Sequence, residues 1–161
     1  MIRLILVSVF LVYFQYFFSI DLGIASTVPN FLLPIVIYFN STKNNITGLI
    51  SGFIFGVILD INSPHTFGST TLLFVTIAFF FGNIKSKINR EQKGFMLFLI
   101  FLTNLFYFLF SNLLFVIFQP NVSIPIFKIL LLIFYNSIYS IIIILFLFLI
   151  DNLQITIKKA R

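Results

Sequence analysis

Cysteine is absent from this chain of 161 residues, and histidine occurs only once, as His65. The lack of cysteine excludes disulfides, thiolate metal sites and cysteine nucleophiles. A zinc site usually needs three or four protein ligands, which one histidine and a few scattered acids do not supply. We therefore expect no metal site and no cofactor, and we interpret His65 as an ordinary loop residue.

Acidic residues are also scarce, with four in the chain against ten lysines and arginines. Asp21, Asp60 and Asp151 fall at the ends of apolar segments, whereas an aspartyl protease needs two acids that share one site. Asp60, Ser63 and His65 lie within one short loop, and a catalytic triad is built by geometry across a fold. No catalytic residue is predicted, and we do not expect an enzyme.

Apolar residues make up most of what remains. The chain is 60% hydrophobic and 9% charged, and its mean hydropathy is +1.15. A soluble domain is roughly 45–50% apolar and about 25% charged. A globule of this size could not bury so much apolar surface, so we expect a single membrane domain whose surface faces acyl chains.

The apolar residues form six segments, which predict an all-α, polytopic bundle of six transmembrane helices over residues 1–161. The second and third segments are shorter than the roughly 17–25 residues that span a bilayer, so we expect them to pack together in the bundle interior. Pro34 should bend the second helix. The segments cover about residues 4–20, 29–39, 46–59, 67–84, 95–118 and 126–150.

The basic residues indicate an orientation. Six crossings that start inside place nine of the ten lysines and arginines, and both termini, on the cytoplasmic side. The exception is Lys128, at the outer start of the last segment, where it can snorkel. This distribution explains the net charge of +6 without nucleic acid as a partner. One cytoplasmic basic loop would face partners or anionic lipid, and its charges are Lys85, Lys87, Arg90 and Lys93.

Small residues recur at a fixed spacing in the third segment. Gly48, Gly52 and Gly56 follow one another every four residues, Asp60 continues the row, and Gly68 comes after a short loop. An i, i+4 row forms one ridge on a helix, and a ridge without side chains lets another helix approach closely. We expect this row to form a helix-packing or partner interface.

Asp60 has two interpretations. Residues 60–64 resemble a turn in which the carboxylate binds local backbone amides, and we favour this reading. Alternatively, Asp60 meets a polar partner such as Lys128 at the outer end of the ridge. A compensating group is expected in both cases, because the helix dipole disfavours a carboxylate at a helix C-terminus.

Polar side chains form mild stripes on three other segments. We interpret them as helix–helix hydrogen bonds, because a substrate pathway usually places ionisable groups deep in the membrane. The alternative is a polar cavity for a small solute. The stripes are Ser8, Gln15 and Ser19, then Thr103, Asn104, Tyr107, Ser111 and Asn112, then Asn136, Ser137 and Ser140.

The stretch from Gly48 to Gly68 resembles the MreD family of bacterial rod shape-determining membrane proteins. Pro34 upstream, the chain length, the six apolar segments and the basic tail fit the same family. Pro64-His65 departs from it, since members often have small residues in this loop. The matching residues are Thr47-Gly48, Gly52-Phe53, Gly56, Ile58-Leu59-Asp60 and Phe67-Gly68.

The resemblance implies a function that composition does not show. It implies a non-catalytic scaffold or regulator of cell-wall elongation in the bacterial inner membrane, which maintains rod shape by binding MreC and coupling to peptidoglycan synthesis. Through MreC the chain would be linked to MreB, RodZ, RodA and the elongation penicillin-binding transpeptidase. The implied fold is similar to the six-helix substrate-binding subunits of energy-coupling factor transporters. A small-solute-binding subunit of such a transporter is therefore the alternative function.

Overall fold

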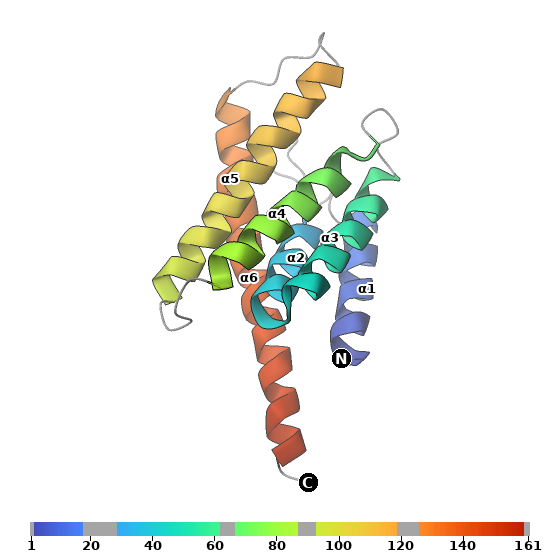
Figure 1. Ribbon diagram of the computed structural model, residues 1–161, viewed down its shortest axis with the longest axis vertical. Coiled ribbons are helices and arrows are strands. Elements are labelled where there is room, and N and C mark those ends of the chain that lie inside the picture. Colours follow the sequence, from blue (N-terminus) through green and yellow to red (C-terminus); the bar gives the residue numbers. More distant parts are fainter. Residues whose placement is uncertain (1, 18–28, 62–66, 87–92, 119–125, 160–161) are drawn as a thin grey trace.

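The computed structural model describes residues 2–17, 29–61, 67–86, 93–118 and 126–159 of the chain. These residues contain six helices and no strand, which confirms the all-α expectation (Figure 1). The helices are α1 (Ile2–Phe17), α2 (Leu32–Thr42), α3 (Asn45–Asp60), α4 (Ser69–Ser86), α5 (Lys93–Phe118) and α6 (Ile126–Lys159).

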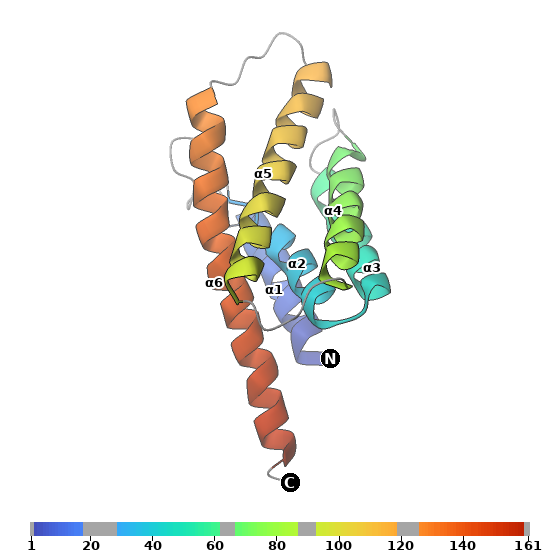
Figure 2. The same ribbon diagram turned by 60° about the vertical axis from the view of Figure 1, so that its left-hand side comes forward.

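Successive helices run in opposite directions, so the start of α1 and the end of α6 lie toward the same end of the bundle (Figures 1 and 2). Helix α6 has 34 residues, which corresponds to about 51 Å at 1.5 Å per residue. The hydrocarbon core of a bilayer is about 30 Å thick. The last turns of α6 accordingly extend beyond the other helices (Figure 2).

Helix α2 is the centre of the bundle. It contacts α1, α3, α4 and α6, and Leu33, Ile35 and Tyr38 have no exposed surface. An 11-residue helix measures only about 16 Å, too short to cross a bilayer alone. It is therefore stable at this depth because other helices cover all of its faces.

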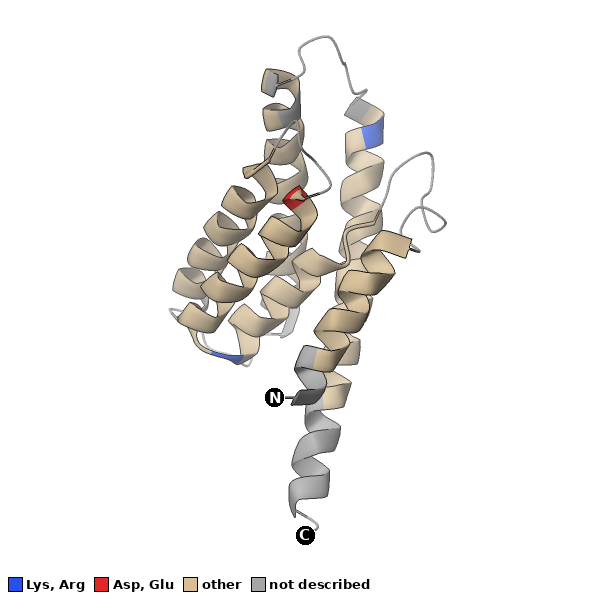
Figure 3. Ribbon diagram, turned by 90° about the vertical axis from the view of Figure 1, so that its right-hand side faces the viewer, with Lys and Arg blue, Asp and Glu red and all other residues tan. Residues whose placement is uncertain are grey.

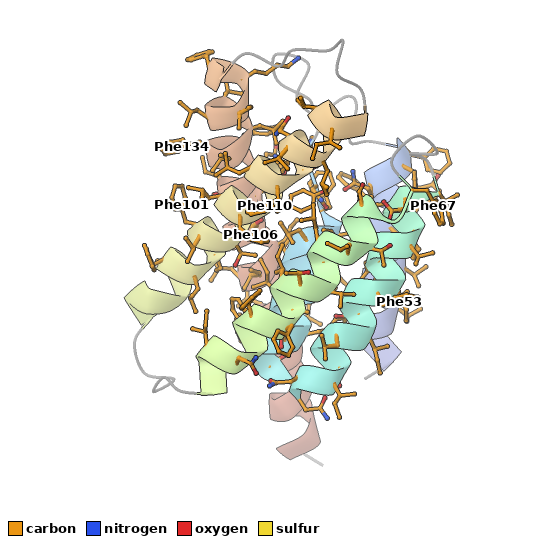
Figure 4. The ribbon with its side chains drawn as sticks, turned by 45° about the horizontal axis from the view of Figure 1, so that its top comes forward. Phe53, Phe67, Phe101, Phe106, Phe110 and Phe134 are labelled. Carbon is orange, nitrogen blue, oxygen red and sulfur yellow. The ribbon has the colours of Figure 1, made fainter. Side chains whose placement is uncertain are left out.

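Helix α3 does not share this interior position, contrary to the expectation for the two short segments. It packs on α2 and α4 through one face, while Ile46, Ile50 and Phe53 on the other face are exposed. Figure 4 shows Phe53 directed away from the neighbouring helices. Only the glycine face of α3 needs a protein neighbour, because lipid can cover the apolar face.

Large hydrophobic side chains are exposed on every described helix except α2. Two stretches, Leu97–Leu114 of α5 and Phe127–Ile150 of α6, are long and apolar enough to cross a membrane. Shorter apolar helices cover Leu6–Phe17, Leu32–Thr42, Asn45–Asp60 and Ser69–Ile84. The charged residues that Figure 3 colours lie near helix ends, so none of the coloured charges lies in the middle of the bundle.

Capping side chains set where two helices begin. The Asn30 side chain accepts from the backbone N–H groups of Leu32 and Leu33, both at 3.1 Å. Helix α2 starts at Leu32, directly after its N-cap residue Phe31 and three residues after the expected start of that segment. The Asn44 side chain likewise accepts from the N–H of Thr47 at 2.9 Å and caps α3.

Candidate functional site

The glycine row of α3 faces other helices of the same chain. Gly48, Gly52 and Gly56 are all buried. A Cβ atom on Gly52 would lie 2.9 Å from the backbone oxygen of Phe74, and one on Gly56 would collide with the backbone of Thr71. Both contacts are with α4. The absence of side chains therefore lets the backbones of α3 and α4 approach closely, as small residues do in membrane helices.

At the N-terminal end of the ridge, the side chain of Asn40 from α2 occupies the space beside Gly48. Asn40 is fully buried, and its side-chain nitrogen donates to the backbone oxygen of Ala78 on α4. A Cβ on Gly48 would lie 2.6 Å from the Asn40 amide carbon, and a Cβ on Gly82 would lie 3.1 Å from its oxygen. The Asn40 amide thus joins α2, α3 and α4 in a slot that two glycines leave open.

Asp60 links the end of α3 to the beginning of α4. It has no exposed surface, and its carboxylate accepts from the backbone N–H groups of Thr70 at 3.0 Å and Thr71 at 2.9 Å. The Thr71 hydroxyl donates to the same carboxylate at 2.6 Å. The first backbone N–H groups of a helix have no partner within the helix and carry partial positive charge. The dipole of α3 disfavours the Asp60 carboxylate at its C-terminus, and the dipole of α4 offsets this because the same carboxylate lies at its N-terminus.

Among the described residues, the partners of Asp60 belong to α4: two backbone amides 10 and 11 positions further along, and the Thr71 hydroxyl. The second interpretation expected a polar partner at this end of the ridge, and within the described part of the chain that partner is Thr71 and not Lys128. Residues 62–66, the rest of the turn on which the favoured interpretation rests, lie outside the described part of the chain.

Gly68 plays a conformational role, distinct from that of the ridge. Its φ angle is +90°, a conformation that other residues rarely adopt, and an added Cβ would meet no atom within 4 Å. Its carbonyl oxygen accepts from the N–H of Leu72 at 2.9 Å, in the first turn of α4. Gly68 therefore sets the direction in which the chain enters α4.

Pro34 lies in the first turn of α2, as the third residue of that helix. The first four N–H groups of a helix have no intrahelical partner, so a proline here removes no hydrogen bond. The sequence expectation of a bend rested on a helix that begins at residue 29. Because the helix starts at Leu32, Pro34 interrupts no backbone hydrogen bond, and the hydrogen-bond pattern requires no bend.

The start of α2 is buried and depends on side chains from two distant helices. Gln15 of α1 donates to the carbonyl of Pro29 at 3.1 Å and accepts from the N–H of Phe31 at 2.7 Å. Asn136 of α6 accepts from the N–H of Asn30 at 2.6 Å. Irregular backbone inside a membrane protein requires such partners, because lipid offers none.

Sequence reasoning had placed Gln15 and Asn136 in polar stripes but had missed Asn30. An asparagine shortly before an apolar run is a typical helix N-cap signal, and it could have located the start of α2. A further stripe pair, Asn104 of α5 and Ser140 of α6, forms a hydrogen bond between helices at 3.2 Å. The interpretation of these residues as helix-joining groups is confirmed at these positions.

The predicted basic loop is described only at its two ends. Lys85 belongs to the last turn of α4, and Lys93 is the first residue of α5. Lys87 and Arg90 lie outside the described residues. The backbone places Lys85 and Lys93 at the end of the bundle where α4 and α5 are connected (Figure 1).

The assembled residues form a joint and carry no recognisable chemistry. Asp60, the glycines and Asn40 are committed to contacts between helices. Within the described part of the chain, no group of three histidine, cysteine or acidic side chains could hold a metal ion. The geometry is suited to fixing α2, α3 and α4 as one unit.

Comparison with known proteins agrees with this picture. A family model described as rod shape-determining protein MreD matches residues 1–157. Neither the curated proteins nor the solved structures contain a match to this chain. The match covers nearly the whole sequence, including the glycine ridge, Asp60 and all six helices apart from the last residues of α6. The chain therefore belongs to the MreD family of rod shape-determining proteins.

Proposed function

We propose that this protein is a non-catalytic scaffold of the bacterial cell-wall elongation machinery, held in the cytoplasmic membrane by six crossings with both termini inside. In this role it binds an MreC-like protein and is linked through it to MreB, RodZ, RodA and the elongation transpeptidase. Family membership implies a part in determining rod shape, and it is the observation that carries the proposal.

The structural support is the rigid joint of α2, α3 and α4. Gly52 and Gly56 are covered by α4 of the same chain, so the ridge holds the protein together and its partner must bind elsewhere. The joint fixes the exposed faces relative to one another, which is what a scaffold requires. Catalysis is not needed for this function.

Recovery of partners from native membranes tests the proposal. The full-length protein, tagged at its C-terminus, is solubilised in mild detergent and the proteins that co-purify are identified. We expect an MreC-like protein together with wall-synthesis enzymes. Recovery of an ATPase pair with its transmembrane coupler would instead indicate the solute-binding transporter subunit, and would overturn the scaffold.

A ridge variant separates the joint from the partner surface. Gly52→Leu places bulk against the Phe74 backbone. It should reduce the amount of partner that co-purifies, and cells that depend on the variant should lose their rod shape. Ile54→Leu, on an exposed face of the same helix, is the matched control and should retain both. Normal shape and recovery with Gly52→Leu would show that the joint does not matter for assembly.

A further inference from the structure

A groove opens between α4 and α5 on the side of the bundle. Its volume is about 270 Å³. The part contributed by α4 includes Ile77, Phe81 and Ile84, and the part contributed by α5 includes Leu99, Leu102 and Phe106. Figure 4 shows Phe106 on α5, with α4 running alongside.

The lining offers hydrocarbon and no available polar group. The one hydroxyl in it belongs to Thr103, and this hydroxyl donates to the carbonyl of Leu99 at 2.7 Å within α5. A polar solute would lose its hydrogen bonds to water in such a groove and gain none. The occupant that suits the lining is therefore an alkyl chain.

The extent of the groove distinguishes a lipid from a partner helix. Ile77 to Ile84 and Leu99 to Phe106 each cover seven residue steps, or about 10 Å along the helix. A transmembrane partner would pack over most of the roughly 30 Å hydrocarbon core, whereas one lipid chain occupies a single leaflet of about 15 Å. The groove is therefore short enough to lie within one leaflet.

The backbone places two basic residues toward the nearer end of this groove. Ile84 directly precedes Lys85, and Leu99 lies six residues, or about 9 Å, from Lys93 at the start of α5. Basic residues between transmembrane helices attract anionic lipid head groups. Lys128 is the third residue of α6, and α6 starts at the other end of the bundle (Figure 1).

From these positions we infer that the α4–α5 groove is a binding site for one anionic phospholipid. An acyl chain lies between Ile77–Ile84 and Leu99–Phe106, and the phosphate head group lies at the end of the groove where Lys85 ends α4 and Lys93 begins α5. The lipid fills the groove that α4 and α5 leave open toward the membrane. The basic end then selects lipids by charge, while the groove selects only for a hydrocarbon chain.

The test compares two lipids that differ only in head-group charge. Full-length protein in mild detergent is titrated with dioleoyl phosphatidylglycerol or dioleoyl phosphatidylcholine, and thermal stability and bound lipid by native mass spectrometry are measured. We expect phosphatidylglycerol to be retained and to raise the melting temperature more. Equal effects of the two lipids would overturn the site.

Variants assign the binding to the two parts of the site. Lys85→Gln with Lys93→Gln should weaken phosphatidylglycerol binding by about tenfold or more and remove the preference over phosphatidylcholine. Leu102→Trp should fill the groove and reduce the binding of both lipids. The matched controls are Lys128→Gln for charge and Ile142→Trp for bulk on the exposed face of α6. Binding that is unchanged in both site variants would refute the proposal.

A photoreactive residue at position 102 provides an independent readout in native membranes, and it does not depend on the stability of Leu102→Trp. Crosslinking to phospholipid supports the site. Crosslinking to another protein or to a second copy of the chain would show that the groove is a protein interface and would overturn the inference.

Discussion

Asp60 joins the end of one helix to the beginning of the next through three hydrogen bonds. It accepts from two backbone N–H groups and one hydroxyl, and none of its side chain is exposed. A buried carboxylate is tolerated here because donors and the positive end of the α4 dipole surround it. Asp60 thus acts as a cap for a helix to which it does not belong.

Removal of this cap should destabilise the α3–α4 pair. Asp60→Ala leaves the N–H groups of Thr70 and Thr71 without an acceptor, and we expect a loss of about 2 kcal/mol. Asp60→Asn keeps one acceptor oxygen and should lose less. Reversible unfolding in detergent measures both. A melting curve of Asp60→Ala that matches the parent protein would show that the carboxylate is not needed.

Gly56 provides a second prediction at this scale. A Cβ there collides with the backbone of Thr71, which cannot rotate away, so Gly56→Ala should cost about 1–3 kcal/mol. Ile54→Ala, two residues earlier on an exposed face, is the control and should have a much smaller effect. Reversible unfolding in detergent measures the stability of both variants. An unchanged stability in Gly56→Ala would mean that α3 and α4 are not in close contact.

At the scale of the helix, α2 owes its stability to its surroundings. The residues directly before it are held by Gln15 of α1 and Asn136 of α6, and its last turn is held by Asn40, which bonds to α4. A helix of 11 residues is marginal in isolation. Its position in the centre therefore depends on the packing of four other helices.

Proline substitutions distinguish the first turn of α2 from its interior. Pro34→Ala removes no backbone hydrogen bond and should change stability by no more than about 1 kcal/mol. Val36→Pro removes the bond to the Leu32 carbonyl and should cost about 3 kcal/mol or more. Comparison of the two melting temperatures tests this difference. A larger loss for Pro34→Ala than for Val36→Pro would contradict the placement of Pro34 in the first turn and of Val36 in the hydrogen-bonded interior of α2.

For the whole molecule, the alternation of helix directions makes the two ends of the bundle different. The end of α2, followed by Lys43, lies toward one end of the bundle with the end of α4 and the start of α5, and the start of α6, which contains Lys128, lies toward the other (Figure 1). With the basic end inside, this arrangement follows the positive-inside rule. Orientation is then a property of the complete bundle and not of one helix.

Because the chain has no cysteine, single cysteines report this orientation directly. We expect Lys43→Cys to react with a membrane-impermeant maleimide only after the cytoplasmic face is opened, and Lys128→Cys to react in intact spheroplasts. The cysteine-free parent protein gives the background. Labelling of Lys43→Cys from outside would reverse the proposed topology.

Composition and periodicity were sufficient to predict several features of this protein. The apolar content required lipid as the solvent, the six runs predicted the helices, and the spacing of Gly48, Gly52 and Gly56 placed them on one helix face. The ordered glycines and Asp60 also pointed to the family that matches residues 1–157. These are local properties, because each depends on residues within a few helical turns.

Only the tertiary structure decided what the polar and small residues contact. The bond between Asn30 and Asn136 joins residues 106 positions apart, and Asn40 reaches α4 across 38 positions. The start of α2, the donors around Asp60 and the neighbour of the glycine ridge all depend on such pairings. A sequence pattern defines the face of a helix, but the partner of that face is chosen by the packing of the whole bundle, where lipid offers no hydrogen bonds to irregular backbone.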